Sequence, residues 1–399
     1  MLKIKTNKFV LFYFYLLTIT TIFYLTSLHL NFSNAMTEWP INYQGGFTRR
    51  GLSGEILFHI STFFDIGFKK SMLLVQCSTY LAFFYLIYLL IKELDSYYLI
   101  YISIFSAIFL LFPLAELEAL GRKEIILSIL FLSVILIKNY SFNYRFVLIS
   151  FGSIIFLLIH EIIFFYFLYF IIFLFIINKN NNFFNNLKIF LFFVLFFIST
   201  WMLVKNSYTT EMMNEMCKSL KENLDVVCGL NAYYTPTSIS KYIGEVQWDI
   251  LHYFRNFFIF ICGYGPLLIL SLFTKFNKKK VNPLIVKVPV SYLLLILIIP
   301  TLLIFFVAVD TGRFFHLSYS MAFIFFFGLK FNDLIKFNHQ NLLIFEKKIF
   351  PKSKILMGFI VFTICFSWNP KAVYHEDLGS IPIYRIYERI DIYYNTLKW

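Results

Sequence analysis

The chain has 399 residues, of which 59% are hydrophobic and 14% charged, and its formal net charge is +13 at pH 7. Soluble globular domains carry about 25% charged residues. The composition therefore excludes a soluble globular protein and favours a protein built for a lipid bilayer. Three of the five cysteines lie inside apolar runs, and five are too few for a disulfide scaffold.

Apolar runs separated by polar residues predict an all-α, polytopic integral membrane protein with about eleven spans. The first run follows three lysines and lacks a small-residue cleavage site, so we interpret it as a retained span. Several runs are shorter than the roughly 20 residues that a bilayer core requires, which predicts tilted helices or half-spans. The expected spans are residues 10–30, 71–91, 97–114, 124–138, 146–159, 162–177, 188–204, 254–273, 289–309, 314–329 and 355–368.

Residues 146–177 are too many for one span and too few for two full spans at 1.5 Å per residue. A helical hairpin with His160 and Glu161 at its tip resolves this conflict. Loops on the amino-terminal side then hold 19 basic and 4 acidic residues, against 16 and 18 on the opposite side. Lys and Arg accumulate on the cytoplasmic side. We therefore expect a cytoplasmic amino terminus. Because this topology accounts for the net positive charge, we expect no nucleic-acid partner.

We expect a single transmembrane domain over residues 1–399, with three larger segments on the outer side. The first loop includes an interfacial helix at residues 52–64, and the second includes an amphipathic helix at 209–224 that acts as a cap. Whether Cys217 and Cys228 of the second loop pair is left open. The three outer segments are residues 31–70, residues 205–252 and the carboxy-terminal tail at 369–399.

Lysine and arginine are distributed differently between the two expected sides of the membrane. Of the 27 lysines, 18 fall on the cytoplasmic side, whereas 7 of the 8 arginines fall outside. Arginine offers a planar fork of donors that matches phosphate and carboxylate oxygens, so an arginine-rich outer face predicts an anionic ligand there. The alternative is that these arginines pair with outer carboxylates or with lipid headgroups.

The first outer loop contains the longest polar motif, which begins at Glu38 and ends in Gly-Gly-Phe-Thr-Arg-Arg-Gly at residues 45–51. The adjacent glycines allow tight turns that expose backbone donors, and Arg49 and Arg50 follow them directly. We interpret the motif as a phosphate-binding loop. A structural turn that leads into an interfacial anchor is the alternative.

The second motif is residues 116–124, with five charges in nine residues between two apolar runs. Such charges at membrane depth are costly unless they line a cavity, so Arg122 and its neighbours are functional candidates. The alternative is a cluster of mutually neutralising ion pairs at a helix end.

Two further candidates lie at helix ends. His160 and Glu161 offer a proton acceptor and a carboxylate at the hairpin tip, or simply a surface-facing turn. Asp310, Arg313 and His316 have the spacing of one helix face. No metal-ligand spacing, nucleotide loop or nucleophile elbow is present in the sequence, so neither a metal nor another cofactor is expected.

These features together resemble the bacterial O-antigen and capsular polysaccharide repeat-unit polymerases, within the wider group of polytopic, lipid-phosphate-dependent glycosyltransferases. The resemblance rests on length, number of spans, Phe- and Ile-rich composition, the large late outer loop and the external arginines. The stretches at 45–51 and 121–124 look like motifs of such enzymes, but they match no defined catalytic motif. The acidic pair usual in the first outer loop of lipid-phosphosugar glycosyltransferases is not evident, and Glu38 is the nearest single candidate.

The resemblance implies polymerisation of undecaprenyl-pyrophosphate-linked repeat units by glycosyl transfer on the outer face of the bacterial cytoplasmic membrane. Arginines would hold the pyrophosphate and stabilise its charge as it leaves, while another residue takes the acceptor's proton. The implied partners are lipid-linked glycans, membrane lipid and a chain-length regulator, with no nucleic acid. The expected pyrophosphate ligands are Arg49, Arg50, Arg122 and Arg313, and the expected base is one of Glu38, His160, Glu161 and Asp310.

Two alternatives remain. A transferase that uses undecaprenyl-phosphate sugars to decorate a glycan differs only in its donor. A lipid-linked glycan flippase would use charges within the spans and two similar halves, whereas here the charges gather at one end and no internal repeat is found.

Overall fold

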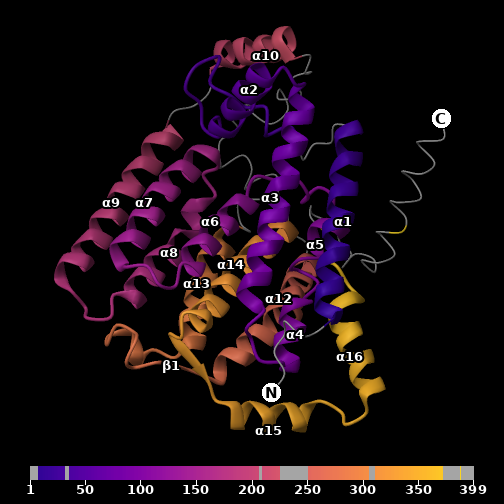
Figure 1. Cartoon of the computed structure of the whole chain (residues 1–399), viewed down its shortest axis with the longest axis vertical. Helices are drawn as coiled ribbons and strands as arrows, with labels where there is room; N and C mark the ends of the chain where they lie inside the picture. The colour runs from indigo at the N-terminus through magenta and orange to yellow at the C-terminus, as the bar shows by residue number, and fades with distance from the viewer. Residues whose placement is uncertain are drawn as a thin grey trace.

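The computed structural model describes residues 8–31, 36–205, 209–224, 250–304, 311–371 and residue 387. Across these residues the chain is all-α except for one two-stranded antiparallel sheet. Figure 1 shows the helices gathered into a bundle with a distinct element at each end.

Six helices in the described residues are long and apolar enough to cross a membrane, which makes the chain a multi-pass membrane protein by helix length and hydropathy. Only structures that satisfy their own backbone hydrogen bonds can cross the hydrocarbon core, and α-helices do so. The long helices are α1 (Lys8–Asn31), α3 (Phe68–Ile91), α7 (Phe142–Ile159), α9 (Phe183–Lys205), α12 (Ile250–Leu272) and α14 (Thr311–Phe331).

Shorter apolar helices accompany the long ones, at most of the positions that the sequence predicts. Contacts between α7 and α8 confirm the expected hairpin, whose tip holds His160 and Glu161. Besides the helix at Leu52–Phe64, the shorter apolar helices in the described residues are α6 (Ile125–Leu136), α8 (Ile163–Ile177), α13 (Val290–Ile304) and α16 (Lys354–Phe366).

The continuous span expected at residues 97–114 is wrong. This stretch contains α4 (Tyr98–Ile104) and the four-residue α5 (Phe112–Ala115), joined by a buried segment of turns. Irregular backbone at membrane depth is tolerated where protein covers it. Side chains of α14 provide that cover, because Tyr319 donates to the Ser103 carbonyl at 2.7 Å and the His316 ring lies 3.0 Å from the Ile108 carbonyl.

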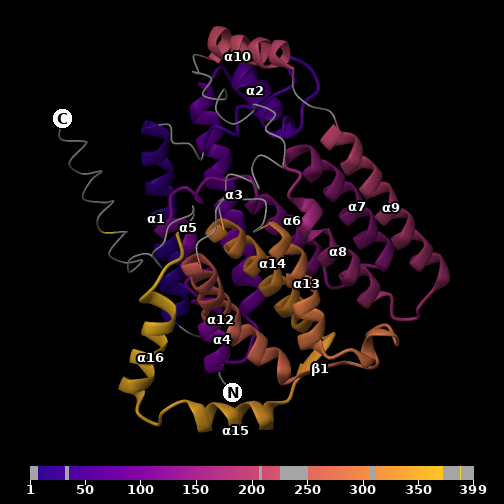
Figure 2. The same ribbon diagram turned by 180° about the vertical axis from the view of Figure 1, so that it is seen from behind.

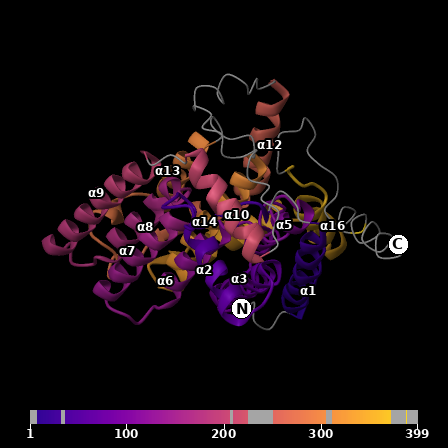
Figure 3. The ribbon, with the colours of Figure 1, turned by 90° about the horizontal axis from the view of Figure 1, so that it is seen from above.

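Helix α14 is the centre of the bundle. Its apolar span is 83% buried, far more than any other long helix in the described residues. It contacts α3, α6, α8, α12 and α13, which surround it when the molecule is viewed from above (Figure 3). The residues at the first turn of α14 are consequently held rigidly among several helix ends.

The two ends of the bundle differ in structure (Figures 1 and 2). One end, here the α2 end, holds α2 (Leu52–Phe64) and α10 (Thr210–Leu224), two helices at positions where the sequence predicts them. The other, the α15 end, holds α15 (His339–Ile349) and the sheet. In the sheet, β1 (Thr274–Phe276) pairs with β2 (Ile335–Phe337).

Candidate functional site

Four chain segments that are far apart in sequence converge near the α2 end. They are the loop before α2, the segment before α6, the turn between α7 and α8, and the first turn of α14. Their ionisable side chains form a connected network, named here the charge cluster. Its members are Glu38, Arg49, Arg50, Arg122, Lys123, Glu124, His160, Glu161 and Arg313.

Glu38 is buried between two guanidinium groups. Its Oε1 lies 3.1 Å from Arg122 Nη1 and 3.4 Å from Arg50 Nη1, while its Oε2 lies 3.7 Å from His160 Nε2. Burial acts to raise the pKa of Glu38, but the positive charges of Arg50 and Arg122 oppose burial and hold the pKa well below its usual range. Glu38 is therefore ionised at neutral pH and is a weak proton acceptor.

Arg50 donates hydrogen bonds from two of its nitrogens to the carboxylate of Glu161. Nε donates to Oε2 at 2.8 Å, and Nη2 donates to Oε1 at 2.5 Å, the paired geometry that guanidinium forms with carboxylate or phosphate. Arg49 Nη1 lies 3.9 Å from the same carboxylate. Burial acts to raise the pKa of Glu161, but Arg50 lowers it more, so Glu161 is ionised as well.

The backbone of the loop that carries Arg50 is held in one conformation by contacts from neighbouring side chains. Arg50 has a φ of +64°, a left-handed conformation that a non-glycine residue adopts only when its surroundings enforce it. Lys123 supplies part of that enforcement, because its Nζ donates to the Arg50 carbonyl at 3.1 Å. Glu55 of α2 supplies more, since its carboxylate accepts from the Tyr43 amide at 2.9 Å and from Gln44 Nε2 at 2.8 Å.

Glycines explain the close packing around this loop. A Cβ on Gly45 would lie 2.0 Å from the backbone oxygen of Met212, so only glycine lets α10 rest on the loop. Gly121 has a φ of +78°, and its carbonyl accepts from Trp39 Nε1 at 2.5 Å. That bond joins the loop before α2 to the segment before α6.

His160 is 4% exposed, and its protonation state follows from its contacts. The amide of Ile162 donates to Nδ1 at 3.1 Å, so the neutral ring carries its proton on Nε2. Burial and the Arg50 charge lower the pKa of His160 to about 4, against opposition from Glu161, Glu124 and Glu38. At neutral pH Nε2 is consequently a hydrogen-bond donor, 3.7 Å from both Glu38 and Glu124, and it cannot accept a proton there.

Glu124 was not among the predicted site residues, although it ends the charged motif at 116–124. It is 4% exposed, and neither of its carboxylate oxygens has a hydrogen-bond partner among the described residues. Oε1 lies 3.6 Å from Arg313 Nε and 3.7 Å from His160 Nε2. Burial acts to raise the pKa of Glu124, but Arg313 and His160 lower it.

A cavity of about 20 Å³ adjoins Glu124 and is also lined by Arg122, Arg313, Ser128 and Tyr80. A polar cavity of this size has room for one water molecule.

Lys123 was also missed. Its side chain is fully buried, and burial lowers the pKa of the ammonium to about 7, against the opposing pull of Glu38. The cluster therefore contains four arginines against three carboxylates, together with a buried lysine whose pKa lies near neutral pH. This surplus of positive charge suits an anionic ligand.

The structure brings together seven of the eight residues proposed from the sequence. Asp310 lies outside the described residues. His316 lines the small cavity beside Glu124, but it is not part of the ion-pair network. Its ring stacks on Phe112 at 5.3 Å and lies 3.0 Å from the Ile108 carbonyl of the broken α4–α5 segment. In the part of the chain that the structure describes, no group of three or more His, Cys, Asp and Glu side chains is arranged to hold a metal ion.

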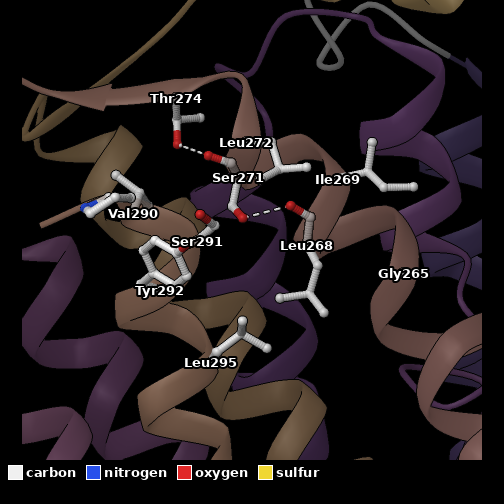
Figure 4. A pocket seen from close by; sticks show the side chains of 11 residues that line it. Gly265, Leu268, Ile269, Ser271, Leu272, Thr274, Val290, Ser291, Tyr292 and Leu295 are labelled. Atoms are coloured by element: carbon white, nitrogen blue, oxygen red, sulfur yellow. Dashed lines mark hydrogen bonds between the residues drawn. The ribbon is translucent and has the colours of Figure 1, made fainter.

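A larger cavity, of about 540 Å³, lies between α12 and α13 and offers little chemistry. None of its lining residues is charged. The hydroxyls of Ser271 and Thr274 are turned back onto the carbonyls of Leu268 and Ser271 (Figure 4). The charge cluster is therefore the stronger candidate site.

Helix α10 covers the loop at residues 41–46. Met216 and Ile41 form a buried hydrophobic cluster, and Met213 and Cys217 pack against it. Cys217 is disulfide-bonded, and Cys228 lies outside the described residues.

Comparison of the chain with protein-family models, with curated proteins and with solved structures finds no match to any of them.

Proposed function

We propose that this protein is a membrane glycosyltransferase that polymerises undecaprenyl-pyrophosphate-linked oligosaccharide repeat units. The observation that carries the proposal is the convergence of four arginines on a buried carboxylate-lined site at one end of the bundle. Transfer of a glycan from a lipid pyrophosphate needs cations for the leaving group and a carboxylate for the acceptor. The charge cluster contains both.

The leaving group is assigned to the accessible edge of the cluster. The side chains of Arg49, Arg50 and Glu161 are 35%, 21% and 19% exposed, whereas those of Glu38 and Glu124 are 9% and 5% exposed. A phosphate would replace the Glu161 carboxylate on Arg50, because guanidinium binds both anions through the same pair of donors. Arg122 and Arg313 would then stabilise the charge that grows on the departing pyrophosphate.

We assign the proton acceptor to Glu124. Glu38 and Glu161 are both held by close arginine contacts, whereas Glu124 makes no hydrogen bond among the described residues and adjoins the small cavity. In the reaction, the acceptor hydroxyl oxygen bonds to the anomeric carbon as the bond from that carbon to the pyrophosphate oxygen breaks. The hydroxyl proton passes to Glu124, directly or through a water in the cavity, and the pyrophosphate leaves as an anion on its lipid.

The role of His160 in this scheme is to position Glu124. Its Nε2 lies 3.7 Å from a carboxylate oxygen of both Glu38 and Glu124, so an N–H donor at this atom would favour the placement of the two carboxylates on either side of the ring. This assignment replaces the role of proton acceptor that the sequence suggested for His160.

The membrane placement is part of the proposal. The six long helices, the four shorter apolar helices and the broken α4–α5 segment would together make about eleven crossings of the bacterial cytoplasmic membrane, with the amino terminus in the cytoplasm and the α2 end outside. Two observations support this orientation. Disulfides persist in oxidising compartments, and Cys217 of α10 is disulfide-bonded. Exposed lysines such as Lys278 and Lys347 lie at the α15 end.

A transferase that decorates a glycan from an undecaprenyl-phosphate sugar would use the same cluster, and the donor separates it from a polymerase. A flippase is less well supported, because the charge cluster lies at one end of the helices and α14 fills the centre with apolar side chains.

The test is the length ladder of surface polysaccharide in a strain that lacks this protein. The strain is complemented with wild type, Arg122→Ala or Glu124→Gln, at equal abundance in the membrane. Glu118→Gln is the matched control, since Glu118 is an exposed carboxylate of the same segment.

We expect wild type and the control to restore long chains, and the two cluster variants to leave a single repeat unit. A normal ladder with altered glycan composition in the deletion would favour the decorating transferase. Loss of the single-unit band in the deletion would favour the flippase. Long chains with both cluster variants would contradict the proposed site.

A further inference from the structure

A second basic pocket lies at the α15 end, away from the charge cluster. It has a volume of about 370 Å³, within the range of small-molecule sites, which is about 300–1,000 Å³. Its walls come from the ends of α6, α8 and α14, the start of α7 and the loop after β1. Four cationic residues line it: Lys138, Arg145, Lys179 and Lys280.

We infer that this pocket binds the phosphate group of an anionic ligand, with a lipid headgroup as the favoured source. The first support is its charge. Asp333 contacts two of the lysines, with Lys138 Nζ at 2.8 Å and Lys280 Nζ at 3.1 Å from its Oδ2. A single carboxylate against four cations leaves a surplus of positive charge, and Asp333 holds lysines from separate segments at one place.

The second support is Arg145, which lines the pocket. Arg145 is 5% exposed, and its Nη2 donates to the carbonyls of Ile137 and Lys138 at 2.9 and 2.7 Å and to Asn332 Oδ1 at 3.0 Å. These bonds fix the guanidinium plane at the end of α6. Its Nε is buried and has no hydrogen-bond partner among the described residues. The guanidinium is therefore fixed beside the pocket, with one donor that no described protein group uses.

The third support concerns the source of the phosphate. Tyr140 lines the pocket, is exposed, and stacks on Tyr144 with ring centroids 4.5 Å apart. Tyrosines gather where a membrane meets water, at the level of the lipid headgroups. Basic pockets between helix ends on the cytoplasmic side are sites for anionic lipid headgroups. This pocket has both features in the orientation proposed above, and it does not depend on the reaction proposed for the charge cluster.

The test uses the intact purified protein in nanodiscs and measures binding of phosphatidylglycerol against phosphatidylcholine by native mass spectrometry. The pocket variant is the double substitution Lys138→Gln and Lys179→Gln. The control is Lys278→Gln and Lys287→Gln, which removes two exposed lysines that do not line the pocket. A single Lys179→Gln variant guards against a folding defect, because its side chain is exposed.

We expect wild type to prefer the anionic lipid, the pocket variant to bind it about tenfold more weakly, and the control to change less than about twofold. Lys179→Gln alone should show part of the loss. Inorganic phosphate is then added as competitor. Displacement of the lipid by millimolar phosphate would indicate a soluble phosphate ligand, and no displacement would indicate the headgroup. Equal losses in the two double variants, or no preference for the anionic lipid, would overturn the inference.

Discussion

The contact between Arg50 and Glu161 ties the loop before α2 to the tip of the α7–α8 hairpin. Substitution of Arg50 by alanine removes the cation that faces both Glu161 and Glu38. Two carboxylates are then left close together with less compensation, so the variant should be less stable. Removal of Glu161 as well should recover part of the loss, because the second carboxylate no longer needs a partner.

The magnitude follows from the geometry and exposure of the pair. Exposed ion pairs contribute about 0.2–1 kcal/mol, and breaking a fully buried pair costs about 3–5 kcal/mol. The Arg50 and Glu161 side chains are 21% and 19% exposed and meet through two short hydrogen bonds. We therefore expect a coupling free energy of about 2 kcal/mol, between these limits.

The assay is a double-mutant cycle of Arg50→Ala and Glu161→Ala, with unfolding free energies measured by SDS titration in mixed micelles. A matched cycle of Lys138→Ala and Asp333→Ala serves as the control, since that pair is 40% and 51% exposed. Its coupling should stay below about 0.5 kcal/mol. Equal coupling in the two cycles would refute the argument that the Arg50 contact is a principal tie of the charge cluster.

Three further predictions follow from single contacts. His160 is neutral when folded, with its pKa lowered to about 4 from 6.5, so the unfolded state binds more protons between these values and stability should fall by about 3 kcal/mol as pH drops from 6.5 to 4. His160→Gln should flatten this profile, and an unchanged slope would contradict the assignment. Gly45→Ala should loosen α10 and speed its proteolysis, because the new Cβ would meet the Met212 backbone, whereas Gly67→Ala meets nothing within 4 Å and should have no such effect. Tyr319→Phe should lower thermal stability by about 1 kcal/mol through loss of its bond to the broken α4 segment, and a variant as stable as wild type would contradict that role.

The helices were largely predictable because a bilayer imposes long apolar runs that are visible in a single sequence. The hairpin at residues 142–177 was predictable from length alone. The stretch at 97–114 was not, because its break depends on cover from α14. Tyr319 and His316 bond to its carbonyls from more than 200 positions away in the chain. Hydropathy reports how apolar a segment is, and it does not report whether lipid or protein surrounds it.

Most members of the charge cluster could be predicted from the sequence, but Lys123, Glu124 and the roles of the side chains could not. Charged residues between apolar runs are rare and costly, so Arg122 and His160 stood out in the sequence. Their roles depend on contacts that spacing does not encode. His160 is a donor at Nε2 because the Ile162 amide occupies Nδ1. Within the described part of the chain, Glu124 accepts no hydrogen bond, whereas the arginines reach Glu38 and Glu161 more closely.

The central claim, that the charge cluster is a pyrophosphate site, is tested most directly by lipid binding to the purified protein. The measurement compares undecaprenyl pyrophosphate with undecaprenol, which shares the hydrocarbon chain and lacks the phosphates, for wild type, Arg122→Gln and the control Glu118→Gln. We predict that wild type and the control bind the pyrophosphate at least about tenfold more tightly than the alcohol, as expected for one or more charge-assisted contacts. Arg122→Gln should lose most of that preference. Equal affinity of wild type for the two lipids would contradict the claim.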